Sequence, residues 1–319
     1  TLRPSHVSVP HQGVYVLELA DLGQSIAVAY SSPHSALGLV DKGTLRETAA
    51  LAGHTGAVSA LAVLPAGQLL SASADASVLQ WDPRARRPAA TLSQGGHKRP
   101  APLLSVAGSG DGVLVAAGSE LTGDDAVIYF WDLRKAETPM YSHSSTHSDD
   151  IPTLSFHPSQ PHLLLSASTD GLLSLTNALE ADEDEAVVEV ANWGVSVAKA
   201  GWAGEGGGRV WARSDMETVS LWDAELSLVH DFGDARRAAV AGGWATDYVV
   251  QCDFRGDDLQ ILAGSNDGSF SHICAPSTDR WALERTYAGG HSAIVRSVLF
   301  DRAALRVFSG GEDGALAAW

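Results

Sequence analysis

The stretch GHSAIVRSVLFDRAALRVFSGGEDGALAAW, residues Gly290–Trp319, decides the fold. It begins with a Gly-His pair, ends on a Trp, and contains two short alternating apolar runs joined by turn residues. Alternation with a period of two predicts strands that bury one face, and glycine lets the chain reverse tightly between them. The stretch therefore predicts the antiparallel strands of one small sheet. Four positions mark its strand ends and its turn: His291, Ser309, Asp313 and Trp319.

Similar units recur along the chain. A Gly-His pair at Gly53-His54 is followed by Trp81-Asp82, and Gly96-His97 is followed by Trp131-Asp132. Units of about 40–45 residues with Gly-His and Trp-Asp are typical of the WD repeat. A chain of 319 residues holds about seven such units. We therefore predict an all-β, seven-bladed WD-repeat β-propeller that forms a single domain over residues 1–319.

The last unit ends at its third strand. A blade without its fourth strand exposes an unpaired edge, which natural proteins cover. The apolar start of the chain near His6–Pro10 can supply the missing strand. We expect the N-terminal strand to complete the last blade and so to close the ring. The first unit, about residues 10–48, has strand patterns near Tyr15–Leu19 and Ile26–Ser31 but no Trp-Asp pair.

The repeated polar residues predict a structural relay inside the blades. The Asp in the turn accepts from the His, the His bridges to the Ser hydroxyl, and we expect that hydroxyl to donate toward the Trp indole. Ser, His and Asp are also the residues of a hydrolase triad, but a set that recurs from blade to blade does not behave like one active site. We predict no catalytic residue, no cofactor and no metal site. The relay residues are His54, Ser71, Asp75, Trp81, His291, Ser309, Asp313 and Trp319.

The composition favours an acidic protein-binding protein. The chain has 38 Asp and Glu against 21 Lys and Arg, a net charge of -17, which makes a nucleic acid an unlikely main partner. The charge suits a basic protein partner, or it serves solubility alone. No apolar run is long enough for a membrane helix, and the start has no secretory pattern. We expect an intracellular protein of the cytoplasm or nucleus, either monomeric or a subunit of a larger complex, with Cys252 and Cys274 as free thiols.

Five segments give a more specific resemblance to the WD repeat-containing protein 89 family. They are THSDDIPTLSFHPSQPHLLLSASTDG at Thr146–Gly171, GGHSAIVRSVLF at 289–300, SGGEDGALAAW at 309–319, the two-aspartate turn and YFWD at Asp124–Asp132, and GWAGEG at Gly201–Gly206. The likeness covers most of the chain and is poor in the first blade. It implies a seven-bladed intracellular scaffold without known catalytic residues.

The first functional hypothesis is a protein-interaction scaffold. Propellers bind partners on the top face, which we define by the loops that precede the innermost strands and those that join second to third strands. Carboxylates there suit a Lys/Arg-rich tail, such as that of a histone or a ribosomal protein. Trp193 is either an apolar anchor of the kind found in binding hot spots or a packing residue of blade five. The residues expected on the top face are Asp124, Asp149, Asp150, Trp193, Asn266, Arg296 and Glu312.

The alternative hypothesis is a substrate receptor of a cullin-type ubiquitin ligase. Two W-D-x-R sequences place Arg84 and Arg134 after third strands, where they would contact the ligase adaptor, although Arg is also common at this position of ordinary WD repeats. The acidic run Glu180–Glu185 is either a solvated loop or a docking site for basic peptides, and Gly108–Gly112 is a turn rather than a phosphate loop. A local basic cluster that could contact RNA or an acidic partner comprises Arg84, Arg86, Arg87, Lys98 and Arg99.

Overall fold

A computed structural model describes residues 1–95, 100–255, 258–275 and 281–319. The predicted fold class is confirmed, because the chain forms seven β-sheets that are the blades of a β-propeller. The blades fall into two compact units. Unit 2, residues 53–233, holds blades two to five, and unit 1, residues 1–52 with 234–319, holds blades one, six and seven. The expectation of a single domain over residues 1–319 stays a prediction.

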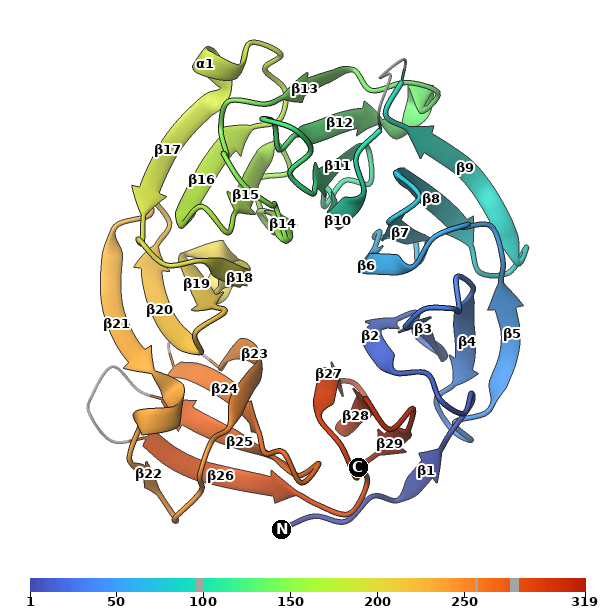
Figure 1. Ribbon diagram of the computed structural model, residues 1–319, viewed down its shortest axis with the longest axis vertical. Coiled ribbons are helices and arrows are strands. Elements are labelled where there is room, and N and C mark those ends of the chain that lie inside the picture. The colour runs from blue at the N-terminus through green and yellow to red at the C-terminus, as the bar shows by residue number, and fades with distance from the viewer. Residues whose placement is uncertain (96–99, 256–257, 276–280) are drawn as a thin grey trace. The chain divides into compact units, whose positions relative to one another are not determined.

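Unit 2 consists of four four-stranded antiparallel sheets that follow one another along the chain (Figure 1). Blade two is β6 Val58–Val63, β7 Leu69–Ser73, β8 Ser77–Asp82 and β9 Arg87–Ser93; blade three is β10 Leu103–Gly108, β11 Leu114–Ser119, β12 Ile128–Asp132 and β13 Tyr141–His143. Blade four is β14 Thr153–Phe156, β15 Leu163–Ala167, β16 Leu172–Asn177 and β17 Val187–Asn192; blade five is β18 Val197–Ala203, β19 Arg209–Ser214, β20 Thr218–Asp223 and β21 Leu228–Asp234.

Unit 1 holds the remaining three blades. Blade one is β2 Val16–Asp21, β3 Ser25–Tyr30, β4 Leu37–Asp41 and β5 Glu47–Leu51. Blade six is β23 Tyr248–Arg255, β24 Asp258–Gly264, β25 Phe270–Ala275 and β26 Trp281–Tyr287, with the short β22 Val240–Ala241 added parallel to β26. Blade seven is β27 Val295–Asp301, β28 Arg306–Gly311 and β29 Leu316–Ala318, with β1 His6–Ser8 at its edge.

The N-terminal strand completes the last blade, as the sequence predicts. β1 pairs antiparallel with β29, and Val7 lies opposite Ala317. The backbone N–H of Ser5 donates to Ala318, and that of Leu2 donates to Thr286 in β26. The first residues therefore satisfy the free edge of blade seven and also join blade six through backbone hydrogen bonds.

Helices contribute little to the described residues, and none of them approaches the length of a membrane span. The helical segments are α1 Glu183–Ala186 and the single-turn 3-10 segments η1 Leu133–Lys135, η2 Glu205–Gly207 and η3 Ala235–Arg237. The core lies between neighbouring blades, where apolar side chains of facing sheets interdigitate. In unit 2, Trp131 of blade three packs with Leu70 of blade two, and in unit 1, Phe308 of blade seven packs with Val16 of blade one. Neither Cys252 on β23 nor Cys274, two strands outward on β25, forms a disulfide.

Candidate functional site

Blade seven contains a complete relay. The Nδ1 atom of His291 lies 3.2 Å from an Asp313 oxygen, and Nε2 lies 2.7 Å from the Ser309 hydroxyl. The indole N–H of Trp319 donates to the same hydroxyl at 2.9 Å. The tight turn places Asp313 under the start of the blade, where it also accepts from the backbone N–H of Ser292 and of Ala315. One carboxylate, one imidazole and one hydroxyl thus connect β28 and the end of β29 with the loop before β27.

The expected direction of one hydrogen bond in the relay is wrong. An indole nitrogen carries a hydrogen and can only donate, so the Ser309 oxygen accepts from Trp319 instead of donating toward it. The hydroxyl hydrogen is then available for Nε2 of His291, and the Nδ1 hydrogen points to Asp313. This assignment uses a neutral imidazole and satisfies every polar atom of the set.

Blade two repeats the arrangement. His54 lies 2.9 Å from Asp75 through Nδ1 and 2.7 Å from Ser71 through Nε2, and Trp81 donates to Ser71 at 2.7 Å. Ser71 and Ser309 are completely buried, so neither hydroxyl can reach a substrate. The relays of blades two and seven therefore have a structural role, because a catalytic nucleophile has to contact the reacting atom of its substrate.

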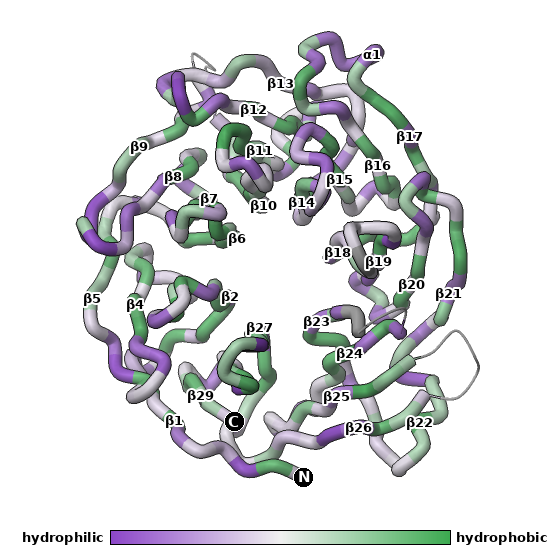
Figure 2. Tube along the Cα trace, turned by 180° about the vertical axis from the view of Figure 1, so that it is seen from behind, coloured by the Kyte–Doolittle hydropathy of each residue, from purple (hydrophilic) through white to green (hydrophobic). Residues whose placement is uncertain are grey.

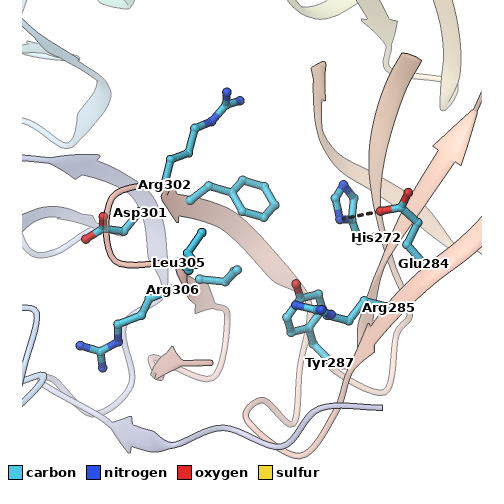
Figure 3. Close-up of a pocket in the computed structure, with 10 residues that line it drawn as sticks. His272, Glu284, Arg285, Tyr287, Asp301, Arg302, Leu305 and Arg306 are labelled. Atoms are coloured by element: carbon cyan, nitrogen blue, oxygen red, sulfur yellow. Dashed lines mark ion pairs between the residues drawn. The ribbon is translucent and has the colours of Figure 1, made fainter. Parts of the chain in front are cut away.

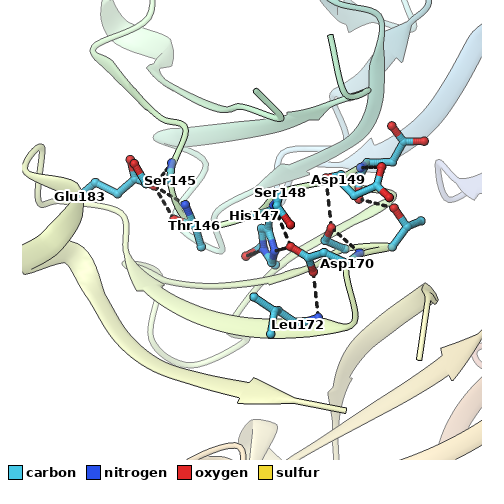
Figure 4. A network of polar contacts seen from close by, with 12 residues as sticks. Ser145, Thr146, His147, Ser148, Asp149, Asp170, Leu172 and Glu183 are labelled. Carbon is cyan, nitrogen blue, oxygen red and sulfur yellow. Dashed lines mark hydrogen bonds and ion pairs between the residues drawn. The ribbon is translucent and has the colours of Figure 1, made fainter. Parts of the chain in front are cut away.

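Blade four keeps part of the relay (Figure 4). His147 contacts Asp170 at 3.3 Å and Ser166 at 2.8 Å, as in the complete sets. Thr176 stands where Trp occurs in the others, and its buried hydroxyl has no hydrogen-bond partner among the described residues. In blade three, Trp131 donates instead to the carbonyl of Ser93, and His97, the expected His of this blade, lies outside the described residues.

Each relay aspartate is held in its charged form. Burial raises the pKa of Asp313, but hydrogen bonds from His291, Ser292 and Ala315 outweigh it and lower the pKa to about 2. The pKa of Asp75 and that of Asp170 are also lowered, because their hydrogen bonds again outweigh the effect of burial. The relay is thus an anionic turn held by donors, a usual way to stabilise a carboxylate inside a protein.

Three of the expected top-face residues lie together in unit 2. Asp124 is exposed in the loop between β11 and β12, and Asp149 and Asp150 precede β14. The carboxylate of Asp150 accepts the backbone N–H of Leu121 at 2.7 Å, which joins the two loops. The antiparallel order of the strands places both loops at the same edge of the sheets. Trp193 precedes β18, is half-buried, and packs edge-on against Trp222 at 6.5 Å between ring centres.

The remaining expected top-face residues, Asn266, Arg296 and Glu312, lie in unit 1. Asn266 is exposed in the turn between β24 and β25, and its backbone N–H donates to Asp247. Arg296 at the start of β27 forms an ion pair with Glu312 in the turn between β28 and β29. The two charges therefore neutralise one another. Their sequence positions alone do not reveal this, because sixteen residues separate them.

The two arginines of the ligase hypothesis follow β8 and β12 at the opposite edge of blades two and three. Arg84 is exposed, whereas Arg134 binds both carboxylate oxygens of Asp132, with its Nη2 atom 2.6 Å from Oδ2. Hydrogen bonds from Arg134 lower the pKa of Asp132 to about 2. Lys98 and Arg99 of the basic cluster lie outside the described residues, and no group of three or more potential ligands fits a metal ion in the described part of the chain.

The acidic run is more ordered than either interpretation of Glu180–Glu185 expects. Residues 183–186 form α1, and Glu183 accepts the backbone N–H groups of Ser144, Ser145 and Thr146 (Figure 4). Figure 2 shows this hydrophilic segment in purple beside the largely apolar β17. Only Glu183 has this structural role, and Asp184 and Glu185 are exposed. No signal in the sequence singles out one carboxylate among five in the run.

Comparisons with known proteins agree with this architecture. The family model "WD domain, G-beta repeat" matches residues 45–82 and 138–177. WD repeat-containing protein GTS1 of Arabidopsis thaliana is 29% identical over 79% of this chain and 66% of its own length. An uncharacterised WD repeat-containing protein of Saccharomyces cerevisiae is 31% identical over 65% of this chain and 53% of its own length. This chain thus spans between about half and two thirds of the length of these two relatives.

The chain has the β-propeller fold, and two of its segments match the WD-repeat model. Within this class, the chain is similar to the WD repeat-containing protein 89 homolog of Dictyostelium discoideum, with 24% identity over 98% of this chain and 84% of the relative. The resemblance deduced from the sequence segments is thereby confirmed. WD-repeat propellers are typically non-catalytic scaffolds for protein interactions.

Proposed function

We propose that the chain is a non-catalytic, intracellular scaffold of the cytoplasm or nucleus that binds a basic segment of a partner protein at the top face of blades three and four. The observation that supports this proposal most is the hydrogen bond from Leu121 to Asp150, which joins two loops. These loops present Asp124 and Asp125 as exposed carboxylates beside Asp149 and Asp150. Loops held by backbone hydrogen bonds lose little conformational entropy when they bind, which favours a firm contact.

A Lys/Arg-rich tail, such as that of a histone or ribosomal protein, fits this surface by charge. The net charge of -17 adds a long-range field that attracts such a tail. Leu121 lies among these carboxylates with 36% of its surface exposed and offers an apolar contact. Trp193 supports the face mainly by packing against Trp222.

The test measures the binding of a fluorescent Lys/Arg-rich peptide to the wild-type chain and to the double variant Asp124→Asn with Asp125→Asn. We expect the variant to bind about three- to tenfold more weakly, because exposed charge pairs each contribute up to about 1 kcal/mol. The affinity of the wild type falls as salt rises.

The matched control is Asp184→Asn with Glu185→Gln in α1, which removes two exposed carboxylates at the opposite edge of blade four. This control binds the peptide like the wild type. Equal weakening in both double variants would show that net charge alone attracts the peptide and would refute a site at the top face. A peptide affinity of the wild type that does not change with salt concentration would also refute this site.

A further inference from the structure

A pocket of about 480 Å³ in unit 1 lies between β25 and β26 on one side and the hairpin of β27 and β28 on the other (Figure 3). Charged side chains of both signs line it, and His272 lies 3.7 Å from Glu284 within it. Arg302, another lining residue, binds Asp253 at 2.7 Å. Because charges of both signs meet in this pocket, it does not select a ligand by charge.

The outer edge of blade four in unit 2 is different. β17 is the last strand of this blade, and in the described part of the chain no further strand pairs with it on the side away from β16 (Figure 1). Its pairing with β16 shifts register near Val188 and is regular from Glu189 to Asn192. The N–H of Val190 donates to the side chain of the adjacent Glu189 at 3.3 Å, a long bond that a new strand can replace. Open edges of this kind are templates for strand pairing.

The exposed side chains of β17 include two large apolar ones on the same face of the strand. Val188 is 59% exposed and Val190 is 43% exposed, and residues two apart point to the same side. On β21 of blade five the exposed pair Leu228 and Val229 is consecutive, so its members point to opposite sides. β9 of blade two begins with Arg-Pro, a usual protection of an open edge. β17 contains neither Lys, Arg nor Pro.

The charge around β17 has a single sign. Residues 178–198 contain six Asp and Glu and no Lys or Arg. Glu189 stands between the two valines of β17 and is itself exposed. Side chains directly opposite one another in neighbouring strands contact, and opposite charges there are favourable. An edge that reads apolar, acidic, apolar is therefore complementary to a strand that reads apolar, basic, apolar.

Blade six shows that a blade of this chain accepts a fifth strand. The short β22 pairs parallel with β26 on its outer side, through Val240 opposite Trp281 and Ala241 opposite Ala282. The outermost strand of a four-stranded blade can thus take up another extended segment. In blade four that position is open over the six residues of β17 in the described part of the chain.

We infer that the outer edge of blade four binds an extended segment of a partner protein as a fifth strand. Apolar residues of that segment lie opposite Val188 and Val190, and a Lys or Arg between them lies opposite Glu189. Backbone hydrogen bonds provide the affinity of such strand addition, and the alternate side chains provide its specificity. This edge shares no residue with the top face of blades three and four, so each surface can be tested and can fail without the other.

Fluorescence polarisation tests the inference with a labelled seven-residue peptide in which Lys and Val alternate. We expect the full chain to bind it, and the double variant Val188→Lys with Val190→Lys to bind about tenfold more weakly, which corresponds to 1.4 kcal/mol. The new lysines remove the apolar contact and repel the peptide. Val188→Thr with Val190→Thr keeps the β-branched shape, and we expect it to weaken binding in the same direction. In the wild type, hydrogen exchange of the Val190 amide slows when the peptide binds.

The matched control is Ala89→Lys with Thr91→Lys, which adds the same charges at two exposed positions of β9 at the outer edge of blade two. It binds the peptide like the wild type, and so does the top-face variant Asp124→Asn with Asp125→Asn. The inference is overturned if the wild type does not bind, or if either of these two variants weakens binding as much as the variant of β17 does.

Two further measurements separate strand addition from other uses of this edge. A peptide with N-methyl groups on its three central residues cannot form the backbone hydrogen bonds, and we expect its binding to be lost. Equal binding of the methylated and unmethylated peptides overturns the inference. Sedimentation of the wild type as a dimer that Val188→Lys with Val190→Lys converts to a monomer would assign the edge to a second copy of the chain, and would also overturn it.

Discussion

The charge of each relay aspartate depends on the groups that donate hydrogen bonds to its carboxylate. Asp313 accepts from the side chains of His291 and Ser292 and from two backbone N–H groups, and these bonds outweigh the cost of its burial. The sequence predicts the four members of the set, because their spacing recurs between blades. It does not settle which atom donates, since that depends on the positions of Ser309 and Trp319 in space.

The balance between burial and hydrogen bonding at Asp313 predicts that the stability of the folded chain depends on pH. The ordinary pKa of the Asp313 carboxyl is 3.8, and the fold lowers it to about 2. A lowered carboxylate pKa stabilises the folded chain above pH 4, and this stabilisation is lost as the pH falls from about 4 to about 2. The difference amounts to about 2 kcal/mol.

The variant Asp313→Asn tests this prediction through chemical unfolding at several pH values. We expect it to be less stable than the wild type by about 2 kcal/mol at pH 7, with the gap narrowing toward pH 2. Asp184→Asn, which changes an exposed carboxylate of α1, is the control and should show a small, constant difference. A gap between Asp313→Asn and the wild type that is the same at pH 7 and pH 2 contradicts the assignment.

At the scale of elements, the N-terminal strand β1 stabilises blade seven by pairing with its last strand, β29. The sequence predicts it because the last repeat stops after its third strand and an unpaired edge needs a partner. It does not predict β22, which pairs parallel with β26 over only two residues. Two residues are too few to produce a periodic pattern.

Deletion of residues 1–10 should therefore destabilise the protein strongly. The deletion removes β1, its pairing with β29, and the hydrogen bonds of Leu2 and Ser5. With about 1 kcal/mol for each lost backbone bond, we expect the Tm to fall by roughly 10 °C. Calorimetry or circular dichroism measures this change. A synthetic peptide of residues 1–10 added in trans should restore part of the loss, and an unchanged Tm would contradict the role of β1.

At the scale of the whole molecule, the acidic charge determines which partners can approach. A net charge of -17 repels a phosphate backbone. We expect no shift of labelled duplex DNA or RNA at about 100 mM salt in a gel assay. A basic protein of similar size is the positive control, and a shift that weakens with salt would contradict the prediction.

The sequence by itself determined the blade content, the relay positions and the exchange of the first strand, because each follows from a local pattern that repeats. Only the tertiary structure decided that Arg296 neutralises Glu312 and that Glu183 alone of its acidic run accepts three backbone N–H groups. These features join residues that belong to different strands and loops. Composition reports how many charges the chain has, whereas folding decides which of them find a partner.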